Sequence, residues 1–406
     1  MSGPLAGLRV FDLSRILAGP TCTQLLGDLG ADIIKIERPG QGDDTRKWGP
    51  PYIKDKNGAN TNESAYYLSS NRNKRSVTID VAKPAGQALA KRLIATCDIM
   101  VENFKAGDMA RYGLAYANLK DQFPKLIYCS ITGFGQTGPY APRAGYDLLA
   151  QGLGGIMSVT GEADRPPMKV GVGIADVMCG MYATTAILAA LHHRNATGQG
   201  QYIDLSLLDT QVAWLVNIGL NYLTSGKVPG RVGNEHPNIV PYNVLECADG
   251  YFLLAVGNDS QFQKFCAFAG APELATDPRF VTNEDRVHNR RVLYDELLPP
   301  LTRSKTQAEW NEGLAKLCVP ASPVNNVKQV FEDPQIRHRG MKITLPHPLA
   351  GSGQVDLIGN PIKYSETPVD YRRAPPYAGQ HTEEVLKELL GVGDAELDRF
   401  KADGAI

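Results

Sequence analysis

Short apolar runs alternate with amphipathic stretches through the first 130 residues. The apolar runs, typical of strands, and the helical stretches between them follow in chain order: LRVFDL, GPTCTQLLGDLG, ADIIKIE, PAGQALAKRLIATC, DIMVEN and KLIYCSIT. Repeated strand, helix, strand units predict parallel β-structure with right-handed crossovers. Residues 98–103 and 125–132 are almost continuously apolar, as expected for strands covered on both faces. We therefore predict a doubly wound α/β domain, with its site at the carboxyl ends of the strands.

The pattern changes in the second half of the chain. Two helical stretches rich in small residues, DLLAQGLGGIMSVTG and ADVMCGMYATTAILAALHH, flank the loop PPMKVGVG, and a strand in TGQGQYIDLS and a further helix follow. A Gly/Pro-rich linker then precedes VPYNVLECADGYFLLAVGND, which predicts two paired strands about a DG turn, followed by helices to about residue 317. The Pro-rich tail ends in one short helix near TEEVLKELL. We predict a Rossmann-like large domain over 1–223 and 330–406 and a smaller α+β domain over 224–329.

Composition narrows the function classes. The 406 residues carry a formal net charge of -1, which gives no reason to expect a nucleic-acid partner. No run of 18 apolar residues and no signal-peptide pattern is present, so we expect neither secretion nor a membrane span. The seven cysteines are scattered without a CxxC, and no His-x3-His pair occurs, so we expect a cytoplasmic protein without a metal site.

Asp176 stands at a predicted helix start, after the glycines of VGVGIAD. Taken from the pattern alone, this carboxylate is either an N-cap that satisfies free backbone N–H groups or a nucleophile made approachable by a glycine backbone. The local sequence leaves both interpretations open.

Basic residues recur near predicted strand ends and helix starts of the first domain, where guanidinium groups often grip phosphates. They are Arg38, Arg46, Arg72, Lys74, Arg75, Lys105 and Arg111. No glycine motif has the spacing that a nicotinamide cofactor requires, and neither GxSxG nor a Walker A sequence occurs. Any one of these basic residues is most often solvated surface, whereas several together at such positions indicate a phosphate-bearing ligand outside those classes.

GNDSQF, at 257–262, lies between a predicted strand and a predicted helix. It is either a plain turn with Asp259 or Ser260 as N-cap or a mobile loop over an active site, freed by Gly257.

Several of these segments together resemble the family III CoA-transferases over nearly the whole chain. The similar segments, in order, are LAGPTCTQLLGDLGADIIKIERPGQGDDTR, NRNKRSVTIDVAKPAG, VENFKAGDMARYGL, SITGFGQTGP, AGYDLLAQGLGGIMSVTG, IADVMCGMYATTAILAAL and TGQGQYIDLSLLD. The resemblance implies that Asp176 is the catalytic aspartate. It also implies an interlocked homodimer in which each chain threads a ring formed by the other.

The resemblance implies a covalent mechanism that needs neither ATP, metal nor a permanently bound cofactor. Asp176 attacks the donor thioester to form a mixed anhydride, and the released CoA converts this into an aspartyl-CoA thioester. A carboxylate of reference pKa ~3.9 needs no base for this, but water must be kept out. The GNDSQF segment is similar to the family's closing loop, represented here by Gly257, Asn258, Asp259, Ser260 and Gln261.

The resemblance also implies a set of residues that line the CoA site. They are Leu17, Ala18, Arg38, Arg72, Lys74, Arg75, Asn103, Phe104, Arg111, Tyr146 and Asp147. Leu17 stands where oxalate-pathway formyl-CoA transferases have Gln, which weakens an oxalate assignment. Tyr146 stands where the α-methylacyl-CoA racemases of the same fold have their basic His, and a tyrosine of pKa near ~10 is a poor base. A racemase is therefore the less favoured alternative.

For the substrates, the chain is most similar to succinyl-CoA:glutarate CoA-transferases, in GDDTRKWGPP, YYLSSNRNK, NIVPY and RVHNRR among other segments. This implies succinyl-CoA as donor and a short dicarboxylate or analogue as acceptor: glutarate, itaconate, malate, citramalate or a sulfinate mimic. Candidates for holding the distal carboxylate are Arg15, Arg46, Arg143, Tyr146 and Tyr242. A catalytically silent acyl-CoA-binding protein is a third hypothesis, and the intact Asp176 argues against it.

Overall fold

Residues 3–406 are described in a computed structural model and form two compact units. The first unit contains the chain up to Ile156, Lys169–Leu220 and Pro334–Ile406, and the second contains Met157–Met168 and Asn221–Asp333. Our prediction from the sequence placed residues 157–168 in the larger domain. They belong to the second unit because the guanidinium of Arg231 donates to the carbonyls of Glu162, Ala163 and Arg165.

The first unit contains a six-stranded parallel sheet with the order β5-β2-β1-β6-β7-β8. Numbered along the chain within this sheet, the order is 3-2-1-4-5-6, that of a Rossmann fold. The six strands are β1 (Arg9–Leu13), β2 (Asp32–Glu37), β5 (Lys74–Thr78), β6 (Ile99–Glu102), β7 (Ile127–Thr132) and β8 (Tyr202–Ser206). The strand order reverses between β1 and β6, so a ligand site is expected beyond Leu13 and Glu102.

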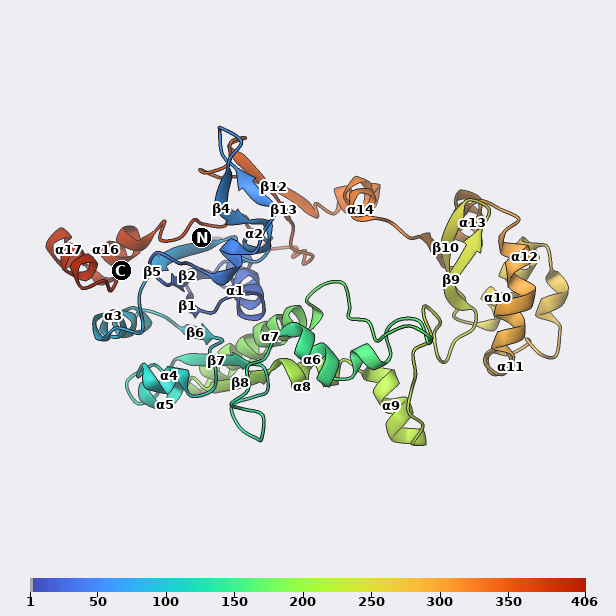
Figure 1. The fold of residues 1–406 in the computed structure, drawn as a ribbon, viewed down its shortest axis with the longest axis horizontal. Helices are drawn as coiled ribbons and strands as arrows, with labels where there is room; N and C mark the ends of the chain where they lie inside the picture. The colour runs from blue at the N-terminus through green and yellow to red at the C-terminus, as the bar shows by residue number, and fades with distance from the viewer. Residues whose placement is uncertain (1–2) are drawn as a thin grey trace. The chain divides into compact units, whose positions relative to one another are not determined.

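Helices cover both faces of this sheet (Figure 1). One face is covered by α3 (Pro84–Ile94), α4 (Asp108–Arg111), α5 (Tyr116–Leu119), α16 (Thr382–Leu390) and α17 (Asp394–Ala402). The other is covered by α1 (Ala18–Asp28), α7 (Ile174–Thr197) and α8 (Leu207–Ala213), with α6 (Asp147–Leu153) beside them. Each layer buries its own apolar core, and together the two cores fix the carboxyl ends of the strands.

Helix α7 is apolar and long enough to cross a membrane by length and composition. Its residues Cys179, Ala183 and Ile187 are nevertheless buried in the core formed with α1 and the sheet. A Cβ on Gly180 would meet the carbonyl oxygen of Ala18 at 2.6 Å, so α1 and α7 approach closely there. The apolar composition of α7 is therefore that of a core helix.

Smaller elements complete the first unit. The strand pairs β3–β4 and β12–β13 share a small apolar cluster that includes Ile53 and Val355. Their bounds, with those of the remaining helices, are β3 (Tyr52–Lys54), β4 (Asn60–Ser64), β12 (Lys342–Pro346), β13 (Gln354–Ile358), η1 (Asp44–Lys47), α2 (Ala65–Leu68) and α15 (Pro334–His338). The chain passes from the first unit into the second within η2 (Ile156–Ser158) and within α9 (Val216–Ser225).

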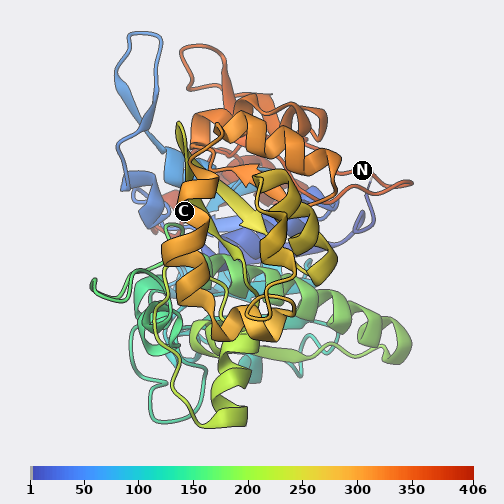
Figure 2. The ribbon, with the colours of Figure 1, turned by 90° about the vertical axis from the view of Figure 1, so that its right-hand side faces the viewer.

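The second unit has a three-stranded antiparallel sheet packed on helices (Figure 2). It comprises β9 (Tyr242–Cys247), β10 (Gly250–Ala255), β11 (Ala321–Pro323), α10 (Asp259–Ala269), η3 (Pro272–Ala275), α11 (Asn283–His288), η4 (Val292–Leu297), α12 (Leu298–Thr302), α13 (Gln307–Lys316) and α14 (Val327–Glu332). The predicted pairing of two strands about a DG turn is confirmed, with Cys247 opposite Gly250.

Three predictions about individual elements are wrong. The helix predicted from Asp147 ends at Leu153, before two glycines, and the helix predicted to run to residue 223 is interrupted between α8 and α9. The tail carries a second helix, α17, in addition to the expected α16.

Candidate active site

Asp176 lies in the first turn of α7 but does not cap it. The N-cap is Gly173, so the N-cap interpretation of Asp176 is wrong. The Asp176 side chain is 8% exposed, and the described part of the chain provides no side chain that forms a hydrogen bond or ion pair with its carboxylate. A buried carboxylate without a partner is unfavourable for stability and is therefore a strong candidate for a functional group.

The environment of Asp176 changes its ionisation. Burial raises the pKa of the Asp176 carboxyl to about 7, and the nearby carboxylate of Asp147 contributes in the same direction. This corrects the expectation that Asp176 is fully ionised at neutral pH. In the free protein this carboxyl is only partly ionised near pH 7.

A cavity of about 110 Å³ opens beside Asp176. Five other residues predicted for the CoA site line it together with Asp176: Leu17, Ala18, Asn103, Phe104 and Tyr146. Three basic side chains, Arg15, Lys105 and Arg143, line it as well. The structure thus brings the candidate nucleophile and these residues around one cavity at the carboxyl ends of the strands.

The wall of this cavity between residues 14 and 16 is held by backbone contacts. Lys35 donates to the carbonyl of Ser14 at 3.0 Å, and the amide of Ile16 donates to Asp43 at 3.3 Å. The side-chain amide of Asn103 contacts both backbone groups of Arg15, accepting from its N–H at 2.9 Å and donating to its carbonyl at 2.7 Å. Ile16 has a φ of 72°, a conformation that a β-branched residue keeps only when its surroundings hold it.

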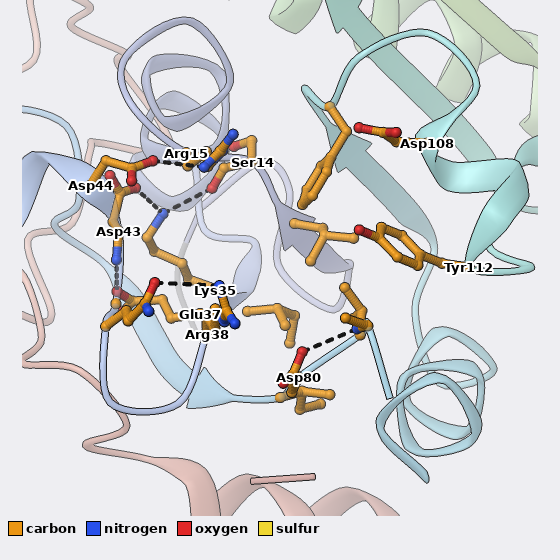
Figure 3. Close-up of a pocket in the computed structure, with 18 residues that line it drawn as sticks. Ser14, Arg15, Lys35, Glu37, Arg38, Asp43, Asp44, Asp80, Asp108 and Tyr112 are labelled. Carbon is orange, nitrogen blue, oxygen red and sulfur yellow. Dashed lines mark hydrogen bonds and ion pairs between the residues drawn. The ribbon is translucent and has the colours of Figure 1, made fainter. Parts of the chain in front are cut away.

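A second cavity, of about 330 Å³, shares Arg15 and Phe104 with the first. Figure 3 shows Lys35 contacting Ser14 and Asp43 on one side of this cavity, with Asp108 and Tyr112 on the other. Predicted phosphate-binding Arg38 also lines it, is exposed, and contacts Gln41 at 3.5 Å. The two cavities therefore adjoin at Arg15 and Phe104, with Arg38 lining one and Asp176 the other.

Three basic residues predicted for the CoA site lie outside both cavities. Arg72 is buried and paired with Asp28, Lys74 is fully buried beside Asp12, and Arg75 pairs with Asp32, Glu384 and Glu388. Arg75 pairs with Asp32 at the amino end of β2, the edge of the sheet opposite the cavities. All three cations form ion pairs with carboxylates of this chain, and none of the three lines either cavity.

Arg111 is exposed and pairs with Asp108, a residue of the larger cavity wall. Asp147 accepts a hydrogen bond from the Ala175 N–H at 2.9 Å, so its carboxylate faces the start of α7. Gln151 was missed by the sequence analysis, although an Asp and a Gln four residues apart on a helix are a recognisable pair. Its amide donates to Asp147 at 2.7 Å.

The residues predicted to bind the distal carboxylate of the substrate lie in different environments. Arg46 is buried between Glu37 and Glu63, with its guanidinium 3.7 Å from the centroid of the Tyr67 ring, so it is not available to a substrate. Arg15 pairs with Asp44 at 2.8 Å, whereas Arg143 is exposed and stacks on Tyr140. Tyr146 lines the cavity beside Asp176, and Tyr242 belongs to the second unit.

The predicted closing loop connects β10 to α10 in the second unit. Neither Asp259 nor Ser260 caps α10, because Asn258 is the N-cap and accepts from the Gln261 N–H. The Gly257 N–H donates to the Gln261 side chain at 2.8 Å, and Asp259 pairs with Arg286 at 2.7 Å. The role of this loop in closing the site stays a prediction.

Metal chemistry has no candidate cluster in the part of the chain that the structure describes. Residues 3–406 contain no group of three or more His, Cys, Asp or Glu side chains placed to hold an ion. The features of the site in the described residues are its carboxylates, its basic side chains and its two cavities.

Comparison with known proteins places this geometry in a family. The model of the family described as CoA-transferase family III matches residues 5–382. The chain is 48% identical over 396 residues to the succinate–glutarate CoA-transferase of Agrobacterium fabrum, a match that covers 95% of this chain and 96% of the relative. It is 41% identical over 403 residues to the succinyl-CoA:glutarate CoA-transferase of Homo sapiens, covering 99% and 90%.

A solved structure agrees with these relatives. The crystal structure of a CAIB/BAIF family protein from Brucella suis superposes with a TM-score of 0.84 at 48% identity, covering 96% of this chain and 100% of that one. Since the matches extend over nearly all of the sequence, the chain belongs to CoA-transferase family III and is a CoA-transferase.

Proposed function

We propose that this enzyme moves CoA from succinyl-CoA to a short dicarboxylate, with glutarate the first acceptor to test. The observation that carries the proposal is the buried carboxylate of Asp176, which lines a cavity and has no partner within residues 3–406. The names of the Agrobacterium and human relatives support the choice of donor and acceptor.

The proposed chemistry begins with an Asp176 carboxylate oxygen attacking the thioester carbon of succinyl-CoA. A C–O bond forms and the C–S bond breaks, which leaves a succinyl-aspartyl anhydride and CoA thiolate. The thiolate then attacks the Asp176 carbonyl carbon, succinate leaves, and an aspartyl-CoA thioester remains. Glutarate runs the two steps in reverse, giving glutaryl-CoA and the Asp176 carboxylate without net uptake or release of a proton.

The residues of this chain would bind, orient and shield these species. Arg38 and the aromatic wall of Phe104 and Tyr112 would receive the CoA moiety, and the fixed backbone of residues 15–18 would border the thioester. The small cavity around Asp176 limits the room for water, which would otherwise hydrolyse the anhydride.

The test of the proposal is product analysis with a panel of acids. The protein is incubated with succinyl-CoA and glutarate, itaconate, malate, citramalate or a sulfinate analogue, and new acyl-CoA species are followed by mass spectrometry. We expect glutaryl-CoA to form. If no acid accepts CoA while the α-proton of a branched acyl-CoA exchanges, a racemase replaces this proposal.

The raised pKa of Asp176 predicts a pH dependence of the first half-reaction. The carboxylate must be ionised to attack, so kcat/KM for succinyl-CoA should be level above about pH 8 and fall about tenfold per unit below about pH 6. Enzyme held at each pH and returned to about pH 8 controls for unfolding. A profile flat from about pH 5 to about pH 8 would contradict the raised pKa.

Arg143 is the proposed anchor for the distal carboxylate of the acceptor. Its guanidinium lines the Asp176 cavity and lies 3.8 Å from the centroid of the Tyr140 ring. For Arg143→Gln, we expect the preference for glutarate over valerate, as a ratio of kcat/KM values, to fall about tenfold or more. The matched control is Arg92→Gln, an exposed arginine of α3, and an unchanged ratio in Arg143→Gln would remove Arg143 from this role.

We further propose an interlocked homodimer. Large apolar side chains of α6 and α7 are about half exposed in the isolated chain, and such a surface favours burial against a second chain. They are Leu148, Leu149, Leu153, Met181 and Tyr182. Two differently tagged preparations should each sediment as dimers and should form no hybrid when mixed natively, but should form hybrids after joint unfolding and refolding. Free exchange under native conditions would contradict interlocking.

A further inference from the structure

The side chain of Gln151 is fully buried on α6 and uses both ends of its amide. Its Nε2 donates to Oδ2 of Asp147 at 2.7 Å, and its Oε1 accepts from the N–H of Val170 at 2.9 Å. The other oxygen of Asp147, Oδ1, accepts from the N–H of Ala175 at 2.9 Å. Two side chains one helical turn apart thus hold the backbone at residues 170 and 175.

The segment between these two points leads directly to Asp176. It contains Gly171 and Gly173, and Val172 within it is 61% exposed, so packing of the Val172 side chain does not fix its path. A Cβ on Gly173 would lie 3.1 Å from Leu17 and 3.7 Å from Asp147, which places the segment against the cavity wall. Holding residues 170 and 175 therefore helps to fix where α7 begins, together with the bond from the Ile174 N–H to the Val172 carbonyl at 2.8 Å.

The direction of the hydrogen bonds is fixed by chemistry. An ionised Asp147 only accepts, so the Gln151 amide must donate to it with Nε2 and is left to accept with Oε1. The Val170 N–H donates to that oxygen, and the Ala175 N–H donates to Asp147. Each polar atom of the relay is thus either a donor or an acceptor, as its hydrogen-bond partner requires.

We propose that Gln151 is a positioning residue for the CoA-transfer reaction: the relay Val170–Gln151–Asp147–Ala175 sets the position of the nucleophile Asp176. The inference rests on the proposed function of Asp176. Gln151 itself touches no reacting atom, and its effect on the rate passes through the loop that presents Asp176. A nucleophile displaced by a fraction of an ångström loses much of the advantage of a prearranged attack.

The relay can be broken and rebuilt with two isosteric changes. Asp147→Asn places two NH2 groups against each other if Ala175 keeps its bond, and Gln151→Glu places two carboxylates against each other. The double variant Asp147→Asn/Gln151→Glu restores every bond with the central one reversed. In it, the introduced asparagine amide donates to the introduced glutamate carboxylate, whose other oxygen accepts from the Val170 N–H. The double variant also keeps the total charge of the pair.

The experiment measures the single-turnover rate of aspartyl-CoA formation from succinyl-CoA, by mass spectrometry of the intact protein. It is carried out at about pH 9, where Asp176 is ionised in every variant, so that changes in its pKa do not enter. We expect each single variant to be slower by about tenfold or more and the double variant to return to within about threefold of the native rate. A double variant as slow as the slower single one would overturn the relay.

Two further variants keep the outcome decisive. Gln151→Met removes both hydrogen bonds at similar volume and should be slowed about tenfold or more even if the double variant folds poorly, with thermal melting reporting its fold. A folded Gln151→Met with the native rate would overturn the proposal. Asp176→Ala separates the two hypotheses: if it abolishes transfer while every relay variant is native-like, only the relay fails, and if it transfers CoA at the native rate, the proposed role of Asp176 fails.

Discussion

Asp176→Asn is expected to reduce CoA transfer by at least ~10³-fold while leaving the fold intact. The amide keeps the volume of the buried side chain in the first turn of α7 but is not a nucleophile toward a thioester. The measurement is glutaryl-CoA formation, together with the absence of an aspartyl-CoA adduct in the mass spectrum. Asp176→Ala is assayed alongside, because slow deamidation of an asparagine would regenerate the aspartate.

The same substitution should stabilise the protein, because Asp176 is unfavourable for folding when it is ionised. The pKa of its carboxyl rises from 3.8 to about 7 on folding, so the folded state binds the proton more tightly. The gain of Asp176→Asn in free energy of unfolding should therefore appear above about pH 4, grow to about pH 7 and stay constant above it, reaching about 1–3 kcal/mol.

Exposed Asp121→Asn is the matched control and should change neither transfer nor stability. An Asp176→Ala enzyme that transfers CoA at the native rate would show that Asp176 is not the nucleophile. If transfer is lost but the free energy of unfolding falls at every pH, Asp176 stabilises the fold through packing, although its carboxylate has no hydrogen-bond or ion-pair partner within residues 3–406.

Much of the sheet could be predicted because several of its strands, such as β6 and β7, are mostly apolar and buried. β1, β2, β6, β7 and β8 all lie within predicted strands, and the order of elements indicated the α/β class. β5 was missed, since it begins Lys-Arg-Ser and does not have the apolar pattern of a buried strand. Its charged side chains are buried all the same, because Asp12 and Asp32 neutralise Lys74 and Arg75.

Candidate site residues could be predicted where a local segment of the sequence indicates them. They could not be predicted where the role of a side chain depends on a partner far along the chain. Leu17, Ala18, Asn103 and Phe104 were implied by the family resemblance, and the structure brings them to the cavity of Asp176. The sequence does not indicate which cations form ion pairs with carboxylates far along the chain, as Arg75 does with Glu384 and Glu388. The raised pKa of Asp176 likewise depends on burial and on Asp147, neither of which one local segment reveals.

Lys74 provides the sharpest test of a predicted CoA contact against a structural role. Its ammonium is fully buried and donates to Asp12 at 3.2 Å, to the Pro20 carbonyl at 3.1 Å and to Asn71 at 3.1 Å. Lys74→Met should lower the free energy of unfolding by about 3–5 kcal/mol, since Asp12 loses a cation that it cannot replace with water. Denaturant unfolding measures this loss.

The mechanism behind the loss predicts a rescue. Burial alone would raise the pKa of Asp12, and Lys74 and Lys35 together hold it below its ordinary value, so removing Lys74 leaves the buried Asp12 carboxylate without its main counter-charge. Asp12→Asn/Lys74→Met eliminates that uncompensated charge and should recover at least about half of the lost stability. KM for succinyl-CoA should stay within about twofold in the folded enzyme, because Lys74 lines neither cavity. A Lys74→Met protein of native stability whose KM for succinyl-CoA is raised about tenfold would instead assign Lys74 to the CoA phosphates.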